Sequence, residues 1–183
     1  MFTLETRRLI LRDWRPDDSR FIWTLASDAR VTRYQTRLRI KDEEAARQWL
    51  TSAMLDNDRQ PRSTYSLAIT LREDGSVIGW LSWHDSEDRT GARRASVTHC
   101  SRRCGKQGYT SEAVLAMLPF VFEVQERHSV YATCATSNPG SAGVLEKAGL
   151  RLVERWMHRD DDLGLEEEYR RYLLNRDDWL AAR

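Results

Sequence analysis

The sequence predicts one α/β (α+β) domain, in which a mixed central sheet carries helices on both of its faces. Strand-like and helix-like segments alternate along the chain in the order βααβββαβαββ, and this order requires a sheet covered on two sides. The chain has 183 residues, a length at which one hydrophobic core can be stable. No stretch resembles a linker or a repeat, so we expect a single domain over residues 1–183.

The first elements are a strand and a helix. In residues 6–14, Leu9 and Leu11 alternate with charged residues and Ile10, which is the period of a strand. Pro16 and the two aspartates that follow it are typical of a helix start. We expect this helix to end near residue 28.

A second helix and a hairpin follow. Acidic residues 42–44 favour a first helical turn, and the apolar residues at 45–54 recur at spacings of three and four. Residues 64–72 and 77–84 are rich in β-forming side chains, and the Asp-Gly pair at 74–75 lies between them. This pattern predicts an antiparallel pair of strands.

The second half of the chain continues the alternation. We expect a strand at 95–100, a helix at 111–126, a strand at 129–136, a short helix ending before Gly149, and strands at 150–159 and 167–175. Pro119 lies inside the first of these helices. Because proline removes one backbone hydrogen bond, we expect a kink between Leu115 and Pro119.

Composition excludes several classes of protein. Lys and Arg number 29 against 28 Asp and Glu, so the chain lacks the positive field of a nucleic-acid binder. No apolar run approaches the ~20 residues of a membrane span, and three cysteines are an odd number that suits a reducing compartment. A zinc site of His99, Cys100, Cys104 and Cys134 is disfavoured because adjacent strand residues face opposite ways. We expect a cytoplasmic protein without a metal, a nucleic acid or a membrane as partner.

A glycine-containing basic loop precedes the helix at 111–126. Residues 102–110 place Gly105 and Gly108 among Arg102, Arg103 and Lys106. Such a turn points backbone N–H groups at one place, where the helix dipole adds about half a positive charge. The loop is suited to a pyrophosphate, although a solvated basic loop would look the same. It matches neither the Walker pattern nor the glycine triplet of a dinucleotide fold.

A second motif makes the chain recognisable. Residues 138–150 read Asn-Pro-Gly-Ser-Ala-Gly-Val-Leu-Glu-Lys-Ala-Gly-Leu, and residues 107–113 read Gln-Gly-Tyr-Thr-Ser-Glu-Ala. Together with the opening Glu-Thr-Arg-Arg-Leu-Ile-Leu-Arg at 5–12, they resemble the GNAT (Gcn5-related N-acetyltransferase) superfamily, in its branch of ribosomal-protein N-terminal acetyltransferases. The resemblance spans nearly the whole chain in the right order.

The resemblance implies an acyl-CoA N-acyltransferase fold with splayed central strands and acetyl-CoA as co-substrate. It implies that the pantetheine arm inserts beside the strand that ends at Cys100, and that the pyrophosphate meets the loop amides. The implied cofactor-binding residues are Cys100, Ser101, Arg103, Gly105, Lys106, Gln107, Gly108, Tyr109, Thr110, Asn138 and Ser141. Two positions depart from the family pattern. Lys106 stands where the family has a glycine two residues before Gly108, and Leu145 stands where many members have a tyrosine that protonates the leaving thiolate.

Catalytic roles follow from the same resemblance. Ser141 is expected to give a proton to the CoA sulfur, although it could serve only as a helix cap. Backbone N–H groups near His99 and Cys100 are expected to stabilise the oxyanion. His84 and His99 are candidate bases because histidine titrates near neutral pH, but a water chain is an alternative. Glu112 lies in a first helical turn, where the helix dipole stabilises a carboxylate, and this explains its position better than a role as the base.

The expected reaction is direct attack of a primary amine on acetyl-CoA in a ternary complex. The acceptor is a protein or peptide N-terminal α-amine or a small-molecule amine, and the protein is a monomer or homodimer. A CoA-binding sensor with little or no turnover is the alternative, since the tyrosine that would protonate the thiolate is absent and the loop glycine is displaced by one residue, to Gly105. Amine-dependent release of CoA would distinguish the enzyme from the sensor.

Overall fold

The computed structural model describes residues 1–32, 40–87, 93–100, 107–160 and 165–183, which form one eight-stranded sheet in the order β1-β2-β3-β4-β5-β6-β8-β7. The strands are β1 (Thr3–Glu5), β2 (Leu9–Asp13), β3 (Thr64–Leu71), β4 (Val77–Glu87), β5 (Arg93–Cys100), β6 (Ser129–Ala135), β7 (Arg151–Asp160) and β8 (Leu165–Asn175). Neighbouring strands are antiparallel, except β5 and β6, which are parallel. The predicted mixed sheet is confirmed.

The parallel strands β5 and β6 separate along most of their length. They pair only at Arg93 with Val130 and at Arg94 with Tyr131, although β5 continues to Cys100 and β6 to Ala135. The other edge of β6 pairs with β8 over the whole of β6. The sheet is therefore splayed, with its closed end at Arg93 and its open end near Cys100 and Ala135.

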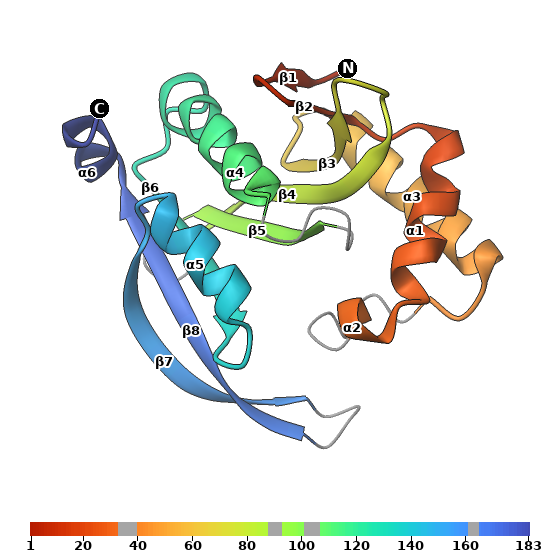
Figure 1. Ribbon diagram of the computed structural model, residues 1–183. Helices are drawn as coiled ribbons and strands as arrows, with labels where there is room; N and C mark the ends of the chain where they lie inside the picture. Colours follow the sequence, from red (N-terminus) through yellow and green to blue (C-terminus); the bar gives the residue numbers. More distant parts are fainter. Residues whose placement is uncertain (33–39, 88–92, 101–106, 161–164) are drawn as a thin grey trace.

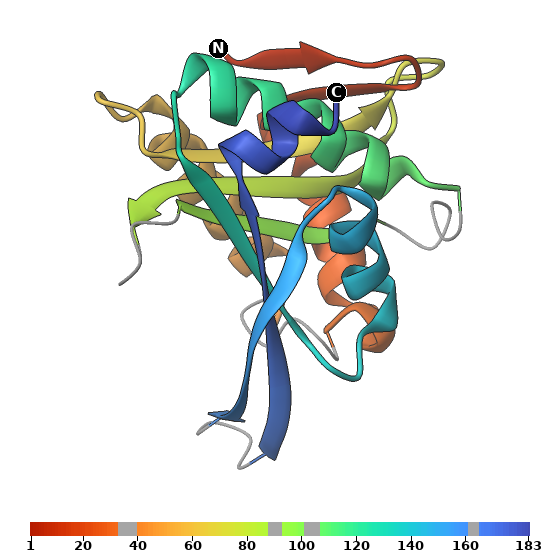
Figure 2. The same ribbon diagram turned by 90° about the vertical axis from the view of Figure 1, so that its left-hand side faces the viewer.

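Helices cover both faces of the sheet, as predicted. Figure 1 shows α4 (Tyr109–Pro119) and α5 (Pro139–Lys147) on one face, with α1 (Ser19–Ala26) and α3 (Glu43–Asp58) on the other. The side view in Figure 2 shows the β7–β8 hairpin extending away from the body of the protein. The shorter helical segments are η1 (Pro16–Asp18), α2 (Ala29–Thr32), η4 (Phe120–Val124) and α6 (Arg176–Ala181).

Each face has its own apolar core. The cluster beneath α4 and α5 includes Trp83, Phe122 and Tyr172, each at most 1% exposed. The cluster beneath α1 and α3 includes Trp14 and Trp80, and the partly buried Trp49 contacts both rings with centroids 5.9 and 5.7 Å away. These tryptophan side chains therefore belong to the two cores.

A buried ion pair joins β2 to the start of α1. Arg12 Nη1 and Nη2 donate to Asp18 Oδ2 and Oδ1 at 2.8 and 2.9 Å, and the two side chains are 10% and 7% exposed. The backbone N–H of Arg15 also donates to Asp18 Oδ2 at 2.8 Å. Removal of one partner would leave a charge buried without compensation.

The two ends of the chain contain elements that the sequence pattern missed. The strand predicted at 6–14 is confirmed as β2, but the sequence pattern missed β1, which precedes it across a turn at Thr6 to Arg8 and pairs with it. The terminal helix α6 follows β8 directly and buries Trp179. Both elements are short, so neither has the length needed to establish a hydrophobic period.

Pro119 changes the hydrogen-bonding pattern of its helix. α4 ends at Pro119, and the chain continues as the π-helical segment η4, where Gln125 N donates to Phe120 O at 2.9 Å. In a regular helix, the N–H at position 119 would donate to the carbonyl one turn earlier. Proline has no N–H, and a π turn is one way in which a helix accommodates the loss. The irregularity in the structure is thus a π segment after Pro119, whereas the kink between Leu115 and Pro119 stays a prediction.

Among the described residues, no helix combines the length and the apolar character that a membrane span requires.

Candidate active site

The open end of the splayed strands leads through a short turn into α5. Asn138 is the N-cap of α5, and its Oδ1 accepts a hydrogen bond from the N–H of Ser141 at 3.1 Å. Thr136 holds the turn to β8, because its backbone N–H donates to Glu168 O and its hydroxyl to Glu168 Oε2, both at 2.8 Å. Asn138, and not Ser141, therefore caps the helix, which leaves the Ser141 hydroxyl available for another contact.

That contact is the thiol of Cys134. The two side chains form a hydrogen bond, and Cys134 lies on β6 facing the core beneath α4 and α5 with 6% of its surface exposed. Burial raises the pKa of the Cys134 thiol above its ordinary value, although the hydrogen bond with Ser141 and the charge of Arg170 oppose this effect. A hydroxyl and a sulfur thus already meet at the first turn of α5.

A cation lies beside this pair. Arg170 on β8 is the register partner of Cys134, so both side chains lie on the same face of the sheet. Arg170 is hydrogen-bonded to Tyr172, and its buried Nε has no hydrogen-bond partner among the described residues. Tyr172 in turn donates its hydroxyl to Glu146 Oε1 of α5 at 3.2 Å. The group formed by Cys134, Ser141 and Arg170 is called the thiol cluster below.

A second turn lies at the start of α4. Gly108 is the N-cap of α4 and has φ +77°, a left-handed conformation that only glycine adopts at little cost. Arg8 fixes this turn from the β1–β2 hairpin, because its Nη1 donates to Gln107 O at 3.0 Å and its guanidinium lies 4.4 Å from the Tyr109 ring centroid. Because Gly108 has no side chain, the first amides of α4 receive no cap from it.

Glu112 is held as an anion in the first turn of α4. Its Oε1 accepts from Thr6 Oγ1 at 2.6 Å and from Arg8 N at 3.0 Å, and its Oε2 accepts from Arg8 Nε at 2.7 Å. Partial burial raises the pKa of Glu112, but the hydrogen bonds from Thr6 and Arg8 and the Arg8 charge together bring it below the ordinary value. The sequence analysis explains Glu112 by the helix dipole and not by a role as the base. Its contacts likewise make it a structural anion at the start of α4.

Glu112→Gln is expected to lower the free energy of unfolding by about 1 kcal/mol at neutral pH, since the pair with Arg8 is partly solvent-screened. Because the folded pKa is lowered, this stabilisation is present above the unfolded pKa of about 4.3 and is lost as the pH falls through the folded pKa. Urea unfolding of both proteins at pH 7 and near pH 3 measures the effect. Glu123→Gln, which alters an exposed pair with Arg183, is the matched control, and a Glu112→Gln difference that persists in acid would contradict the assignment.

The two candidate histidines lie at opposite ends of the β4–β5 ladder. His84 pairs with Arg94 at the closed end of the splay, whereas Thr98 pairs with Trp80 and Cys100 with Gly79, so His99 is an extra residue in a bulge at the open end. With a rise of about 3.3 Å for each residue, the two backbones lie roughly 15 Å apart. A single amine bound in the site can therefore be deprotonated by only one of these histidines.

Part of the expected CoA site lies outside the described residues. Ser101, Arg103, Gly105 and Lys106 belong to that part, and for His99 and Cys100 the structure describes the backbone alone. Gln107, Gly108, Tyr109 and Thr110 form the described end of the loop and the start of α4. Asn138 and Ser141 are brought to the open end of the splayed strands from α5.

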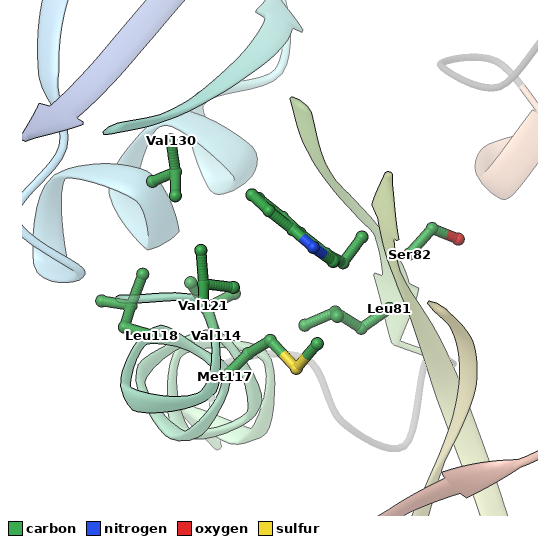
Figure 3. Close-up of a pocket in the computed structure, with 8 residues that line it drawn as sticks. Leu81, Ser82, Val114, Met117, Leu118, Val121 and Val130 are labelled. Carbon is green, nitrogen blue, oxygen red and sulfur yellow. The ribbon is translucent and has the colours of Figure 1, made fainter. Parts of the chain in front are cut away.

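A separate apolar pocket lies between α4 and the sheet. Figure 3 shows Val114, Met117 and Leu118 of α4 and Val121 of η4 facing Leu81 of β4, while Ser82 points away. Val130 and Trp83 complete the lining, and Trp83 Nε1 is buried without a partner among the described residues. None of the described side chains that line this pocket is titratable, and the pocket is distinct from the thiol cluster.

Sequence reasoning missed three residues that organise the site. Cys134 was considered only as a zinc ligand, and Arg8 and Arg170 were not singled out for the site. The alternation of Val130, Ala132 and Cys134 along the strand could have placed the thiol on the buried face. The roles of Arg8 and Arg170 depend on contacts with residues distant in sequence, for which the local pattern contains no signal.

The chain is similar to known acetyltransferases. The model of the acetyltransferase (GNAT) domain family matches residues 8–151. An uncharacterized N-acetyltransferase of Bacillus subtilis (strain 168), YnaD, is 25% identical over 148 residues, which cover 81% of this chain and 82% of that protein.

Two solved structures have the same fold. RimL, a ribosomal L7/L12 alpha-N-protein acetyltransferase in complex with coenzyme A and with a CoA–cysteine disulfide, superposes with a TM-score of 0.81 at 15% identity, over 97% of this chain and 99% of that one. Spermidine N-acetyltransferase from Vibrio cholerae, in complex with CoA and spermine, has a TM-score of 0.77 at 16% identity, over 96% and 99% of the two chains.

Proposed function

The chain belongs to the GNAT acetyltransferase family, and from this premise we propose that its acceptor is the α-amine of a protein or peptide N-terminus. Membership makes it an N-acetyltransferase that uses acetyl-CoA, the thioester that supplies the activated acetyl group. The observation that carries the proposal is the thiol cluster at the open end of the splayed strands, where a hydroxyl is already hydrogen-bonded to a sulfur.

The described residues fit the co-substrate at both of its ends. The uncapped start of α4 at Gly108, together with the basic loop before it, suits the pyrophosphate. The unpaired part of β5 and β6 suits the pantetheine arm, and Asn138 holds the turn beside it. The full set proposed to hold acetyl-CoA is Cys100, Ser101, Arg103, Gly105, Lys106, Gln107, Gly108, Tyr109, Thr110, Asn138 and Ser141.

We place the sulfur of acetyl-CoA at the thiol cluster. RimL, which has the same fold, binds CoA with a disulfide to one of its cysteines, so a cysteine can lie beside the CoA sulfur in this architecture. In this chain, the buried Cys134 is a free cysteine, and it contacts Ser141. Ser141 would then donate a proton to the departing thiolate, as the resemblance implies.

The chemistry of the amine favours an α-amine. At pH 7, deprotonation of a lysine side chain with a pKa of about 10.4 costs about 4.6 kcal/mol, whereas an α-amine with a pKa of about 7.8 costs about 1 kcal/mol. The carboxylate of Glu146 lies beside the thiol cluster and accepts a hydrogen bond from the Tyr172 hydroxyl, and a carboxylate is too weak a base to deprotonate a lysine side chain at low cost. We propose His99 as the base before His84, since its backbone lies at the open end of the splay, where β6 leads into α5.

The proposal predicts that peptides with a free N-terminal α-amine release CoA from acetyl-CoA about tenfold faster than N-terminally blocked peptides containing lysine. The measurement is thiol release with peptides, polyamines, aminoglycosides and free amino acids, followed by mass spectrometry of the product. The same assay on His84→Ala and His99→Ala identifies the base.

Two outcomes would overturn the proposal. If spermine or spermidine is the preferred acceptor, the chain resembles the polyamine enzyme of Vibrio cholerae in its substrate. If acetyl-CoA binds by calorimetry but no amine in the panel is acetylated, the chain is a CoA-binding sensor.

A further inference from the structure

We propose that β7 is a dimerisation edge, along which a second copy of this chain lays its own β7 antiparallel to the first. The inference goes beyond the proposed function, since it concerns the outer edge of the sheet and not the site of acetyl transfer. In the dimer, one continuous sheet runs through both copies.

β7 is the last strand of the sheet. In the order β1-β2-β3-β4-β5-β6-β8-β7, no described strand lies beyond it. Its ten residues, Arg151–Asp160, span about 33 Å, which is long for a strand of a globular protein. Figure 2 shows that the β7–β8 hairpin carries this edge away from the body of the protein. A long outer edge presents backbone N–H and C=O groups with which another strand can pair.

Exposed apolar side chains gather on the same strand. Leu152, Val153 and Met157 are 40, 54 and 62% exposed, and the half-buried Trp156 lies next to Met157 in the strand. Trp156 packs on Tyr169 of β8, with ring centroids 5.8 Å apart. A second β7 laid along this edge would cover part of each of these side chains, which favours association.

The arginines of β7 do not oppose such pairing, because β8 supplies their counter-charges. Arg155 Nη1 lies 3.7 Å from Glu168 Oε2, and Arg159 Nη1 lies 4.0 Å from Glu166 Oε1. Charged side chains often protect an edge strand from association. Here the protection is weakened, since each of these charges has a partner within its own hairpin.

The sequence of β7 is complementary to itself in one register. With Trp156 on the two-fold axis, Glu154 lies opposite His158 of the second copy, and the symmetry repeats this pair. The three residues alternate along β7, so they share one face, the face on which Trp156 lies beside Tyr169. A histidine N–H can then donate to the Glu154 carboxylate. On the other face, Arg155 lies opposite Met157.

Neighbouring registers bring like charges together. If the axis moves from Trp156 to Arg155, the two copies of Arg155 face each other. If it moves to Met157, Arg155 of each copy faces Arg159 of the other. Like charges directly opposite destabilise an antiparallel pair. The register with Trp156 on the axis is therefore the one that we assign.

The first measurement is the mass of the full chain by sedimentation equilibrium. A pair of single strands is small beside the roughly 1,600 Å² of a standard interface, so we expect a dimer that dissociates on dilution. The mass should rise with concentration from 21.4 kDa toward twice that value.

Met157→Arg tests the surface, because it places two arginines opposite each other on both sides of the axis. We expect the dissociation constant of the dimer to rise by about tenfold or more. The register partner of Met157 within the chain is Glu168, which can pair with the new cation, so folding is retained. Adding Arg155→Glu restores opposite charges across the axis and should recover the dimer. Leu55→Arg is the matched control, since Leu55 on α3 is also 62% exposed.

Cross-linking tests the register. In Trp156→Cys, the two new thiols lie opposite each other, with Cα atoms about 4.5–5.5 Å apart, and oxidation should join two chains by a disulfide at this position. In Arg155→Cys, the two thiols are offset along the strands by two residues. Their Cα atoms are then more than about 7 Å apart, which is too far for a disulfide. Peptide masses distinguish this cross-link from one that involves another cysteine.

A chain that stays at 21.4 kDa at every concentration at which it is soluble would overturn the inference. So would a dimer that Met157→Arg leaves intact, or a disulfide that forms equally fast in Arg155→Cys and Trp156→Cys. Thiol release from acetyl-CoA is measured on the same samples. A monomer that acetylates an amine would overturn the dimer alone, whereas a dimer that acetylates no amine would overturn the proposed function alone.

Discussion

Ser141→Ala is expected to lower kcat for acetyl transfer by about 100-fold, the effect of removing a positioned proton donor. The Ser141 hydroxyl meets a sulfur in the thiol cluster, and Leu145, one turn later on α5, is 2% exposed and has no proton to give. The hydroxyl of Tyr172 donates to Glu146, so it does not replace Ser141. KM for acetyl-CoA should change little, because the donor acts mainly on the leaving thiolate.

Steady-state kinetics with the preferred amine and varied acetyl-CoA measure both constants. Ser129→Ala, at the other end of β6, is the matched control and should retain the parent kcat. If kcat of Ser141→Ala stays within about threefold of the parent, a water supplies the proton and Ser141 is not the donor. Folding should be nearly unaffected, since the variant loses one hydrogen bond worth about 1 kcal/mol.

Asp18→Ala is expected to lower the free energy of unfolding by about 3–5 kcal/mol, because Arg12 would remain buried without its counter-charge. Asp18 accepts hydrogen bonds from both terminal nitrogens of Arg12 and from the N–H of Arg15. A loss of this size is a large part of the roughly 5–15 kcal/mol that stabilises a typical domain.

Urea denaturation at 25 °C measures the change. Asp17→Ala is the matched control, since Asp17 is the exposed neighbour in the same turn and should change stability by no more than about 0.5 kcal/mol. Asp18→Asn keeps a hydrogen-bond acceptor and should be milder, which keeps the test available if Asp18→Ala does not fold. A loss below about 1 kcal/mol for Asp18→Ala would show that water reaches Arg12.

The Arg12–Asp18 pair fixes the start of α1 to the sheet on the face opposite α4 and α5. The cluster that includes Trp14 and Trp80 underlies this face. The co-substrate is proposed to lie along the splay between β5 and β6, so an amine that reaches the thioester from the α1 face would meet elements held by this pair. Loss of the pair should therefore affect the acceptor side more than the thiol cluster.

Long elements and local motifs were determined by the sequence alone. The hairpin around the Asp-Gly pair at 74–75 and the helix predicted from residue 111, which begins at Tyr109 in the structure, depend on turn residues and hydrophobic period. Each of these is a property of neighbouring residues, so the sequence pattern contains it. The resemblance to the GNAT family adds the splay of β5 and β6, which the register confirms.

Tertiary structure alone decided which distant residues meet. Cys134, Ser141 and Arg170 come from β6, α5 and β8, and only the order of the strands brings the arginine beside the thiol. Arg8 reaches Gln107 and Glu112 from about a hundred residues earlier in the chain. The separation of His84 from His99 likewise depends on the β4–β5 register. A local pattern fixes the conformation of neighbouring residues, whereas the pairing of strands fixes which chemical groups share a site.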